Sequence, residues 1–319
     1  ALRAPGLGAM AAQTPSLGIL PGTASLLHNN LACSSGGWLC SVHNSVMPGG
    51  GKLVMHKLSA ASKEGPEVTQ AMSIRYLELP FGPVLVVSST KGTKIYNEDA
   101  TLQLYFAPLT DQGADLDVLK HHQGACLVPA TQHIVIGTSK GSLSLVQAVA
   151  ADQFIPLPES LPSSAAAPGD VAIVDVCYCA AVDTVVSAHA NGELRTWVPA
   201  SNFANVAVIP AVGQAPVRVG SLGLQLLVAY GPGTICFFDA RTYELQAELT
   251  AHARWTTAVT VREDTNQIVT VGEDTVLNLW QVDPSSGQVS LHHTSVVSDK
   301  LLTGVALLAN GAAVTAYDS

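Results

Sequence analysis

The sequence predicts an all-β fold, a single seven-bladed β-propeller, from three observations. Apolar residues occur in short runs of about four to eight, which is the usual length of a β-strand. Glycine-containing turns join these runs in pairs, as in β-hairpins. Hairpins of this pattern begin again every roughly 41 to 50 residues, and a four-stranded propeller blade needs a repeat of this size.

Most of the seven hairpins follow one template along the chain. These start with an apolar strand and a small or polar pair, continue through a turn that contains glycine, and end in an alternating strand. The predicted hairpins lie near 38–58, 84–97, 133–147, 183–198, 224–239, 266–282 and 311–319.

Both faces of such a strand pair are apolar. In the sixth hairpin Val276 and Trp280 lie on one face, and Leu277 and Leu279 lie on the other. A sheet that is apolar on both faces cannot stand alone in water, but blades stacked in a ring bury each face against a neighbour.

Composition excludes several classes of protein. Hydrophobic residues make up 48% of the 319 residues and charged residues 12%, yet no apolar run of about 18 residues predicts a membrane span. The net charge is −9 and no basic run occurs, so a nucleic-acid-binding surface is not expected. The six cysteines mostly fall within apolar strands, which indicates buried thiols in a reducing, cytoplasmic compartment.

The propeller is expected to occupy 23–319. An irregular leader, 1–22, precedes it and is predicted to help close the ring beside the last blade. The proline-rich segment 151–170 is predicted to form a long surface loop between the third and fourth blades. The residues in this loop that we take as candidates for partner binding are Phe154, Pro156 and Pro158.

The segment from Ala251 to Asp283 resembles a repeat of the WD-repeat family. The motif residues are the His of "AH", a Thr on the next strand, an Asp in the "GED" turn and a Trp on the third strand. The resemblance implies a WD40-type propeller with degenerate repeats, in which His252, Thr270, Asp274 and Trp280 form a hydrogen-bonded structural tetrad. A catalytic pair made of His252 and Asp274 is the alternative interpretation.

The fourth hairpin carries part of the same pattern. Ser187 and Trp197 are present, but Asn191 stands in the turn where the family has Asp, and no Gly-His pair leads into the repeat. A partial tetrad of Ser187, Asn191 and Trp197 is therefore expected. Other hairpins keep the turn glycine and lose the Trp, so their resemblance to the family depends on spacing alone.

Other motifs carry weaker chemical signals. "MPGGGKL" lacks the spacing and hydroxyl of a phosphate-binding loop, and "CYC" at 177–179 has one residue too few for a CxxC zinc half-site. The adjacent histidines at 121–122 and 292–293 would face opposite sides of a strand. The aspartates of "DQGADLD" lack the order of a calcium-binding loop. We therefore expect no metal site and no cofactor.

The sequence predicts a non-catalytic scaffold for protein–protein interaction within a multi-subunit assembly. No catalytic residue, nucleic acid, membrane or small-molecule substrate is expected. The family resemblance implies that a cytoskeletal assembly, such as a ciliary axoneme, is a plausible location. The alternative is a propeller enzyme, or a binder of small ligands or modified peptides, that uses its central channel.

Overall fold

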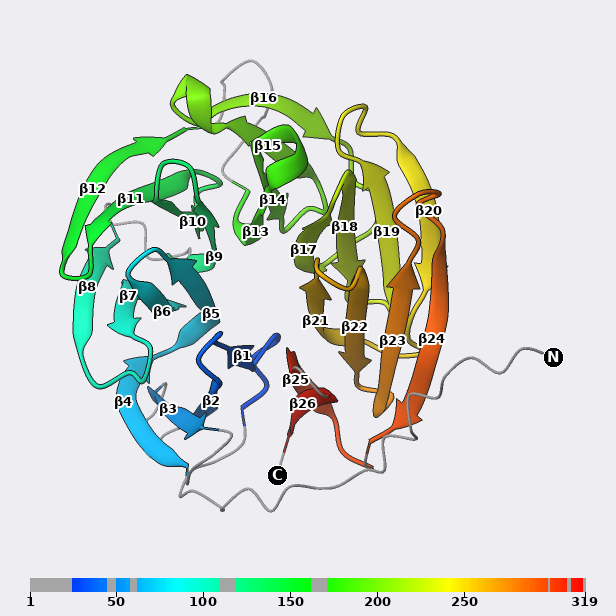
Figure 1. Ribbon diagram of the computed structural model, residues 1–319, viewed down its shortest axis with the longest axis horizontal. Coiled ribbons are helices and arrows are strands. Elements are labelled where there is room, and N and C mark those ends of the chain that lie inside the picture. The colour runs from blue at the N-terminus through cyan, green and yellow to red at the C-terminus, as the bar shows by residue number, and fades with distance from the viewer. Residues whose placement is uncertain are drawn as a thin grey trace.

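The structure, a computed structural model, is a ring of β-sheets around a central axis (Figure 1). It describes residues 25–44, 50–57, 62–109, 119–161, 171–297, 299–308 and 311–317. The predicted leader, 1–22, lies outside these residues. No helix in this part of the chain is long and apolar enough to cross a membrane.

Six sheets contain four antiparallel strands each, in the order of the sequence. The first blade consists of β1 (Ala32–Cys33), β2 (Trp38–Asn44), β3 (Gly50–Lys57) and β4 (Lys63–Thr69). The second consists of β5 (Ala71–Leu79), β6 (Gly82–Ser89), β7 (Gly92–Asn97) and β8 (Gln103–Pro108). The third consists of β9 (His122–Val128), β10 (His133–Thr138), β11 (Leu143–Ala150) and β12 (Gln153–Ser160). The fourth blade consists of β13 (Ile173–Cys179), β14 (Thr184–His189), β15 (Leu194–Val198) and β16 (Ala204–Ile209). The fifth consists of β17 (Pro216–Leu222), β18 (Gln225–Tyr230), β19 (Thr234–Asp239) and β20 (Leu245–Thr250). The sixth consists of β21 (Thr256–Arg262), β22 (Gln267–Gly272), β23 (Val276–Val282) and β24 (Val289–Val296).

The remaining sheet has two strands, β25 (Leu302–Leu308) and β26 (Gly311–Ala316). Two short 3₁₀ helices, Ala180–Val182 and Pro199–Ser201, follow β13 and β15. The innermost strand of each sheet faces the axis, and the fourth strand of each complete blade lies at the rim (Figure 1).

The prediction of an all-β propeller is confirmed, but the predicted number of seven blades is wrong. The described residues form six four-stranded blades, and the described part of the seventh predicted hairpin forms β26, paired with β25 in a two-stranded sheet. The difference lies in the last predicted unit. Residues 311–316 form one strand, β26, and among the described residues no further strand pairs with its other edge.

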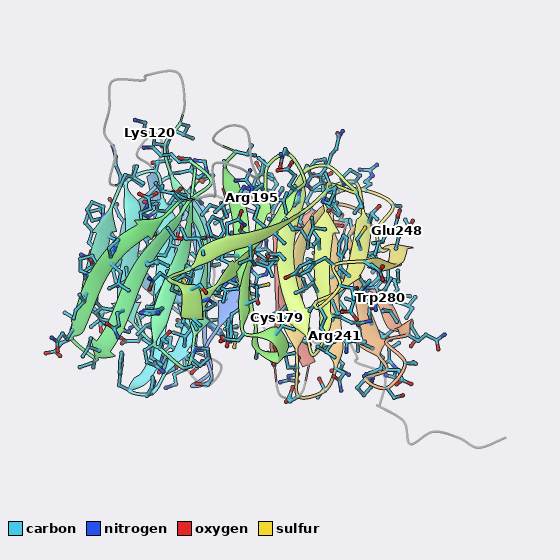
Figure 2. All side chains as sticks on the ribbon, turned by 90° about the horizontal axis from the view of Figure 1, so that it is seen from above. Lys120, Cys179, Arg195, Arg241, Glu248 and Trp280 are labelled. Atoms are coloured by element: carbon cyan, nitrogen blue, oxygen red, sulfur yellow. The ribbon has the colours of Figure 1, made fainter. Side chains whose placement is uncertain are left out.

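Apolar clusters join neighbouring sheets. Each of the six clusters among the described residues takes side chains from two consecutive sheets, beginning with the first and second and ending with the sixth blade and β25–β26. Seen from the side, the sheets stand across the thickness of the ring with their side chains packed between them (Figure 2). This packing explains why the strands are apolar on both faces.

Polar contacts, by contrast, join the last sheet to the first. The backbone N–H of Asn30 donates to the Thr303 carbonyl at 2.9 Å, and the Thr315 hydroxyl donates to the Asn30 carbonyl at 3.1 Å. A Cβ at Gly304 would lie within 2.6 Å of the backbone of residues 30 and 31, so only glycine permits this approach. We call this joint, made by Asn30, Thr303, Gly304 and Thr315, the seam.

The predicted loop 151–170 is corrected in its first half. Residues Gln153–Ser160 form β12, the outermost strand of the third blade, whereas 162–170 lie outside the described residues. Pro156 and Pro158 are compatible with a strand here because an edge strand does not need every backbone N–H for pairing. Proline content thus misled the prediction.

Candidate functional site

The sixth blade joins the four residues of the predicted tetrad in one chain of hydrogen bonds. The Trp280 indole N–H donates to Thr270 Oγ1 at 3.2 Å, and Thr270 Oγ1 lies 2.8 Å from His252 Nε2. His252 Nδ1 lies 3.0 Å from Asp274 Oδ1. Asp274 also accepts the backbone N–H of Ala253 at 3.0 Å. All four side chains therefore have partners inside the blade.

Local structure explains how distant residues meet. His252 lies between β20 and β21, Thr270 on β22, Asp274 in the turn after β22 and Trp280 on β23, so antiparallel folding brings them together. The carboxylate can only accept, which assigns the proton to His252 Nδ1 and makes Nε2 the acceptor for the Thr270 hydroxyl. Burial lowers the pKa of His252 despite the opposing effect of Asp274, and the ring is neutral near pH 7.

The fourth blade holds a second network of the same kind. Trp197 Nε1 donates to Ser187 Oγ at 2.8 Å, and Ser187 Oγ lies 2.9 Å from His189 Nε2. His189 Nδ1 lies 2.9 Å from the Val171 carbonyl. Trp197, Ser187 and His189 are fully buried. A histidine on the strand itself therefore takes the place that His252 takes in the sixth blade.

Asn191 does not belong to this network. Its Oδ1 accepts the backbone N–H of Glu193 at 3.1 Å, which closes the turn between β14 and β15. The sequence signal for His189 was the spacing Ser-x-His, because residues two apart on a strand share a face. Sequence reasoning also missed His122, whose Nδ1 lies 3.0 Å from Thr93 Oγ1 between the second and third blades.

Three charged side chains meet in the central channel. Arg75 of β5 forms an ion pair with Asp175 of β13, with 2.7 Å between Nη2 and Oδ1. Arg75 Nη1 also donates to the carbonyls of Ala125 at 2.6 Å and Val176 at 2.8 Å. Arg218 of β17 approaches the same carboxylate less closely, with 3.6 Å between Nε and Oδ2. Sequence analysis missed this cluster because its members are 43 or more residues apart.

The candidate contact residues do not lie together on the surface. Phe154 is buried and stacks on Tyr105 with ring centroids 5.7 Å apart, so its side chain is committed to the packing between the second and third blades. Pro156 and Pro158 are exposed on β12. Phe154 is therefore not available to a partner in this conformation.

The weaker motifs have ordinary structural places. Cys177 and Cys179 are buried thiols of β13, and burial raises the pKa of each. His121 and His122 have different partners, and His292 and His293 lie on the exposed strand β24. Residues 50–53 of "MPGGGKL" begin β3, while the aspartates 111, 115 and 117 lie outside the described residues. The part of the chain that the structure describes contains no group of three or more potential metal ligands.

Comparison with known proteins decides the family. The model of the WDR54 family matches residues 8–319, nearly the whole chain. The chain belongs to the WDR54 family. It is 26% identical to WD repeat-containing protein 54 of Mus musculus over 272 residues, 83% of this chain and 80% of the relative. It is also 26% identical to WD repeat-containing protein 54 of Homo sapiens over 283 residues, 86% of this chain and 84% of the relative.

The ring is similar to that of a more distant solved protein. A chain in the crystal structure of the mitotic checkpoint complex superposes with a TM-score of 0.71 at 13% sequence identity, covering 93% of this chain and 87% of that one. At this identity the likeness shows the fold alone. Membership of the WDR54 family thus comes from the sequence, and the propeller fold comes from both comparisons.

Proposed function

We propose that this WDR54-family chain is a non-catalytic scaffold that binds partner proteins at the rim of its propeller. A WD-repeat propeller is consistent with protein–protein interaction. The hydrogen bonds of His252 and Asp274 favour a structural role, because Thr270 and the blade backbone occupy the groups that a catalytic pair would present to a substrate.

The observation that carries this proposal is the apolar character of the rim. The outermost strands β8, β12, β16, β20 and β24 each expose a large apolar side chain, with exposed fractions between 38% and 55%. These side chains are Phe106, Ile155, Val206, Leu245 and Leu291. Aromatic and aliphatic side chains on a rigid surface supply the buried anchors of a protein interface.

The rim of the first blade differs. Its outermost strand, β4, has the sequence KEGPEVT, and its one large apolar residue, Val68, is buried. The polar strand β4 therefore provides an internal control for the apolar strands of the other blades.

Affinity capture from a lysate with mass spectrometry tests the proposal. Val206 and Leu291 are exposed on the rim, and Val206→Glu and Leu291→Glu should each reduce capture of a stoichiometric partner protein, because a charge would replace an apolar contact. Thr69→Glu on β4 adds the same charge at an exposed polar position and should leave capture unchanged. Equal melting temperatures of the three variants would show that the ring is intact.

Two results would overturn the scaffold proposal. One is partner capture that is insensitive to every rim substitution, and the other is co-purification of a metal or metabolite with no partner protein. The location in the cytoplasm, and within a cytoskeletal or ciliary assembly, is part of the proposal. Fluorescence imaging of the tagged protein tests it, and a tag that never coincides with cytoskeletal structures would contradict it.

A further inference from the structure

The two arginines of the central channel are not equivalent. Arg75 donates to two carbonyls and to Asp175, so it links the second, third and fourth blades. Among the described residues, no acceptor lies within hydrogen-bond distance of the Arg218 guanidinium. Its nearest carboxylate oxygen, Asp175 Oδ2, is 3.6 Å from Nε and already accepts the backbone N–H of Val219 at 3.0 Å.

The channel cluster therefore has an excess positive charge. Asp175 is the single carboxylate between Arg75 and Arg218, and its stronger contact is with Arg75. Burial, with the repulsion of Arg75, lowers the pKa of Arg218 to about 10, and the group remains charged at neutral pH. The Arg218 side chain is 23% exposed, so water or an anion can reach its N–H groups and accept the hydrogen bonds that no described protein group accepts.

Space for such an anion lies beside Arg218. Two cavities of about 300 Å³ and about 260 Å³ share walls formed by Arg75, Arg218, Thr260 and Val261. A water molecule occupies about 30 Å³ in the liquid, so each cavity has room for a group of several heavy atoms.

The remaining charged groups on the walls are few. Arg262 lines the larger cavity, where it forms an ion pair with Asp264 at 3.4 Å, and Glu263 lines the smaller one. The two cavities together carry three arginines and one glutamate, and Asp175 and Asp264 pair with two of these arginines, which leaves Arg218 as the arginine with the weakest carboxylate contact. The Thr260 hydroxyl adds a neutral donor to both walls, whereas the Ser221 hydroxyl already donates to the Tyr178 carbonyl at 3.0 Å.

We propose that these cavities form a binding site for an oxyanion, a carboxylate or phosphate group, that accepts hydrogen bonds from the Arg218 guanidinium. The planar fork of an arginine matches the paired oxygens of such a group, and Arg75 is already held in place as the second cation. This site is separate from the rim, so the proposal goes beyond the scaffold function.

Isothermal titration calorimetry of the full chain tests the site. Inorganic phosphate and succinate, each added at constant ionic strength, should bind saturably to the unchanged protein. Arg218→Met keeps an apolar stem of similar length and should weaken binding about tenfold or more. Arg254→Met is the matched control, because Arg254 is exposed, lies outside both cavities and carries the same charge. It should bind as the unchanged protein does.

A second variant and a peptide distinguish the remaining outcomes. Arg218→Lys keeps the charge without the fork and should bind with intermediate affinity, which tests the site even if Arg218→Met fails to fold. Binding of the acetylated, amidated peptide Glu-Glu-Glu, and not of Gln-Gln-Gln, would identify a protein carboxylate as the source of the anion. Absence of saturable binding by phosphate, succinate and the acidic peptide would overturn the proposal. Equal affinity in Arg218→Met and Arg254→Met would also overturn it.

Discussion

The fourth and sixth blades solve the same problem with different residues. Each contains a tryptophan N–H, a hydroxyl and an imidazole in one line, yet the sixth ends on the Asp274 carboxylate and the fourth on the Val171 carbonyl. The sixth takes His252 from the connection before the blade, whereas the fourth takes His189 from its own strand.

The difference teaches that both blades keep the same order of groups, from indole N–H to hydroxyl to imidazole, although the histidines stand at different positions in the two blades. A buried tryptophan N–H and a buried imidazole both need partners, and either a carboxylate or a backbone carbonyl satisfies the last N–H. Burial lowers the pKa of both histidines. The Asp274 carboxylate opposes this effect on His252, and the Val171 carbonyl opposes it on His189. Burial lowers the pKa of His189 to about 4.

The largest expected effect comes from the tryptophan at the centre of the fourth network. Trp197 has 0% of its surface exposed, so Trp197→Ala should lower the free energy of unfolding by about 3–5 kcal/mol, through lost packing and a cavity. Trp280→Ala should lower the free energy of unfolding by less, because Trp280 is 9% exposed. Urea denaturation measures both values, and a greater loss at Trp280 would reverse the comparison.

Removal of the carboxylate in the sixth network should have the next effect. Asp274→Ala leaves His252 Nδ1 and the Ala253 N–H without their acceptor and should cost about 1–3 kcal/mol. Asp274→Asn keeps an acceptor oxygen and should cost less. Thermal and urea unfolding of the two variants check this order, and an unchanged midpoint for Asp274→Ala would contradict a stabilising network.

Acid should weaken the fourth network through His189. Its pKa is about 4 in the folded chain and about 6.5 when unfolded, so the unfolded state binds the proton more readily. The stability that depends on neutral His189 is therefore fully present above pH 6.5 and is lost as the pH falls toward 4. The free energy of unfolding should fall by about 2 kcal/mol at pH 5 from this group. Unfolding curves at pH 7 and pH 5 measure the loss. His189→Gln should remove this share of the pH dependence, and an identical pH dependence in the variant would refute the assignment.

The smallest effect is expected at Asn191, which the sequence placed in the fourth network. Asn191 accepts only one turn N–H, so Asn191→Ala should change the free energy of unfolding by no more than about 0.5 kcal/mol. The same urea titration serves as the measurement. A loss as large as that of Asp274→Ala would show that Asn191 does act as the counterpart of Asp274.

The repeat pattern predicted the fold because each hairpin carries local signals. Six of the seven predicted hairpins coincide with the middle strands of the six blades, for example 266–282 with β22 and β23. The last predicted hairpin does not match a hairpin of the described residues, because 311–316 form a single strand that pairs with β25. The segment β12 was mistaken for a loop because its prolines occupy an edge strand. Strand pairing at a rim tolerates residues that local propensity disfavours.

The candidate site also contains residues that the sequence could predict and residues that it could not. His252, Thr270, Asp274 and Trp280 could be named because a family motif fixes their spacing. The contacts among Arg75, Asp175 and Arg218 could not be predicted, because they depend on how the innermost strands of separate blades surround the axis. His189 carried a usable signal in its spacing from Ser187, although no motif pointed to it.

Within the described part of the ring, the seam is a junction held by hydrogen bonds and not by an apolar cluster. Hydrophobic packing weakens on cooling, whereas the hydrogen bonds that Asn30 makes with Thr303 and Thr315 do not depend on buried apolar area. None of the six apolar clusters of the described residues spans this junction, so its amides should exchange with deuterium before those of the six apolar interfaces. Opening of the circle thus has a preferred starting point, beside the shortest of its sheets.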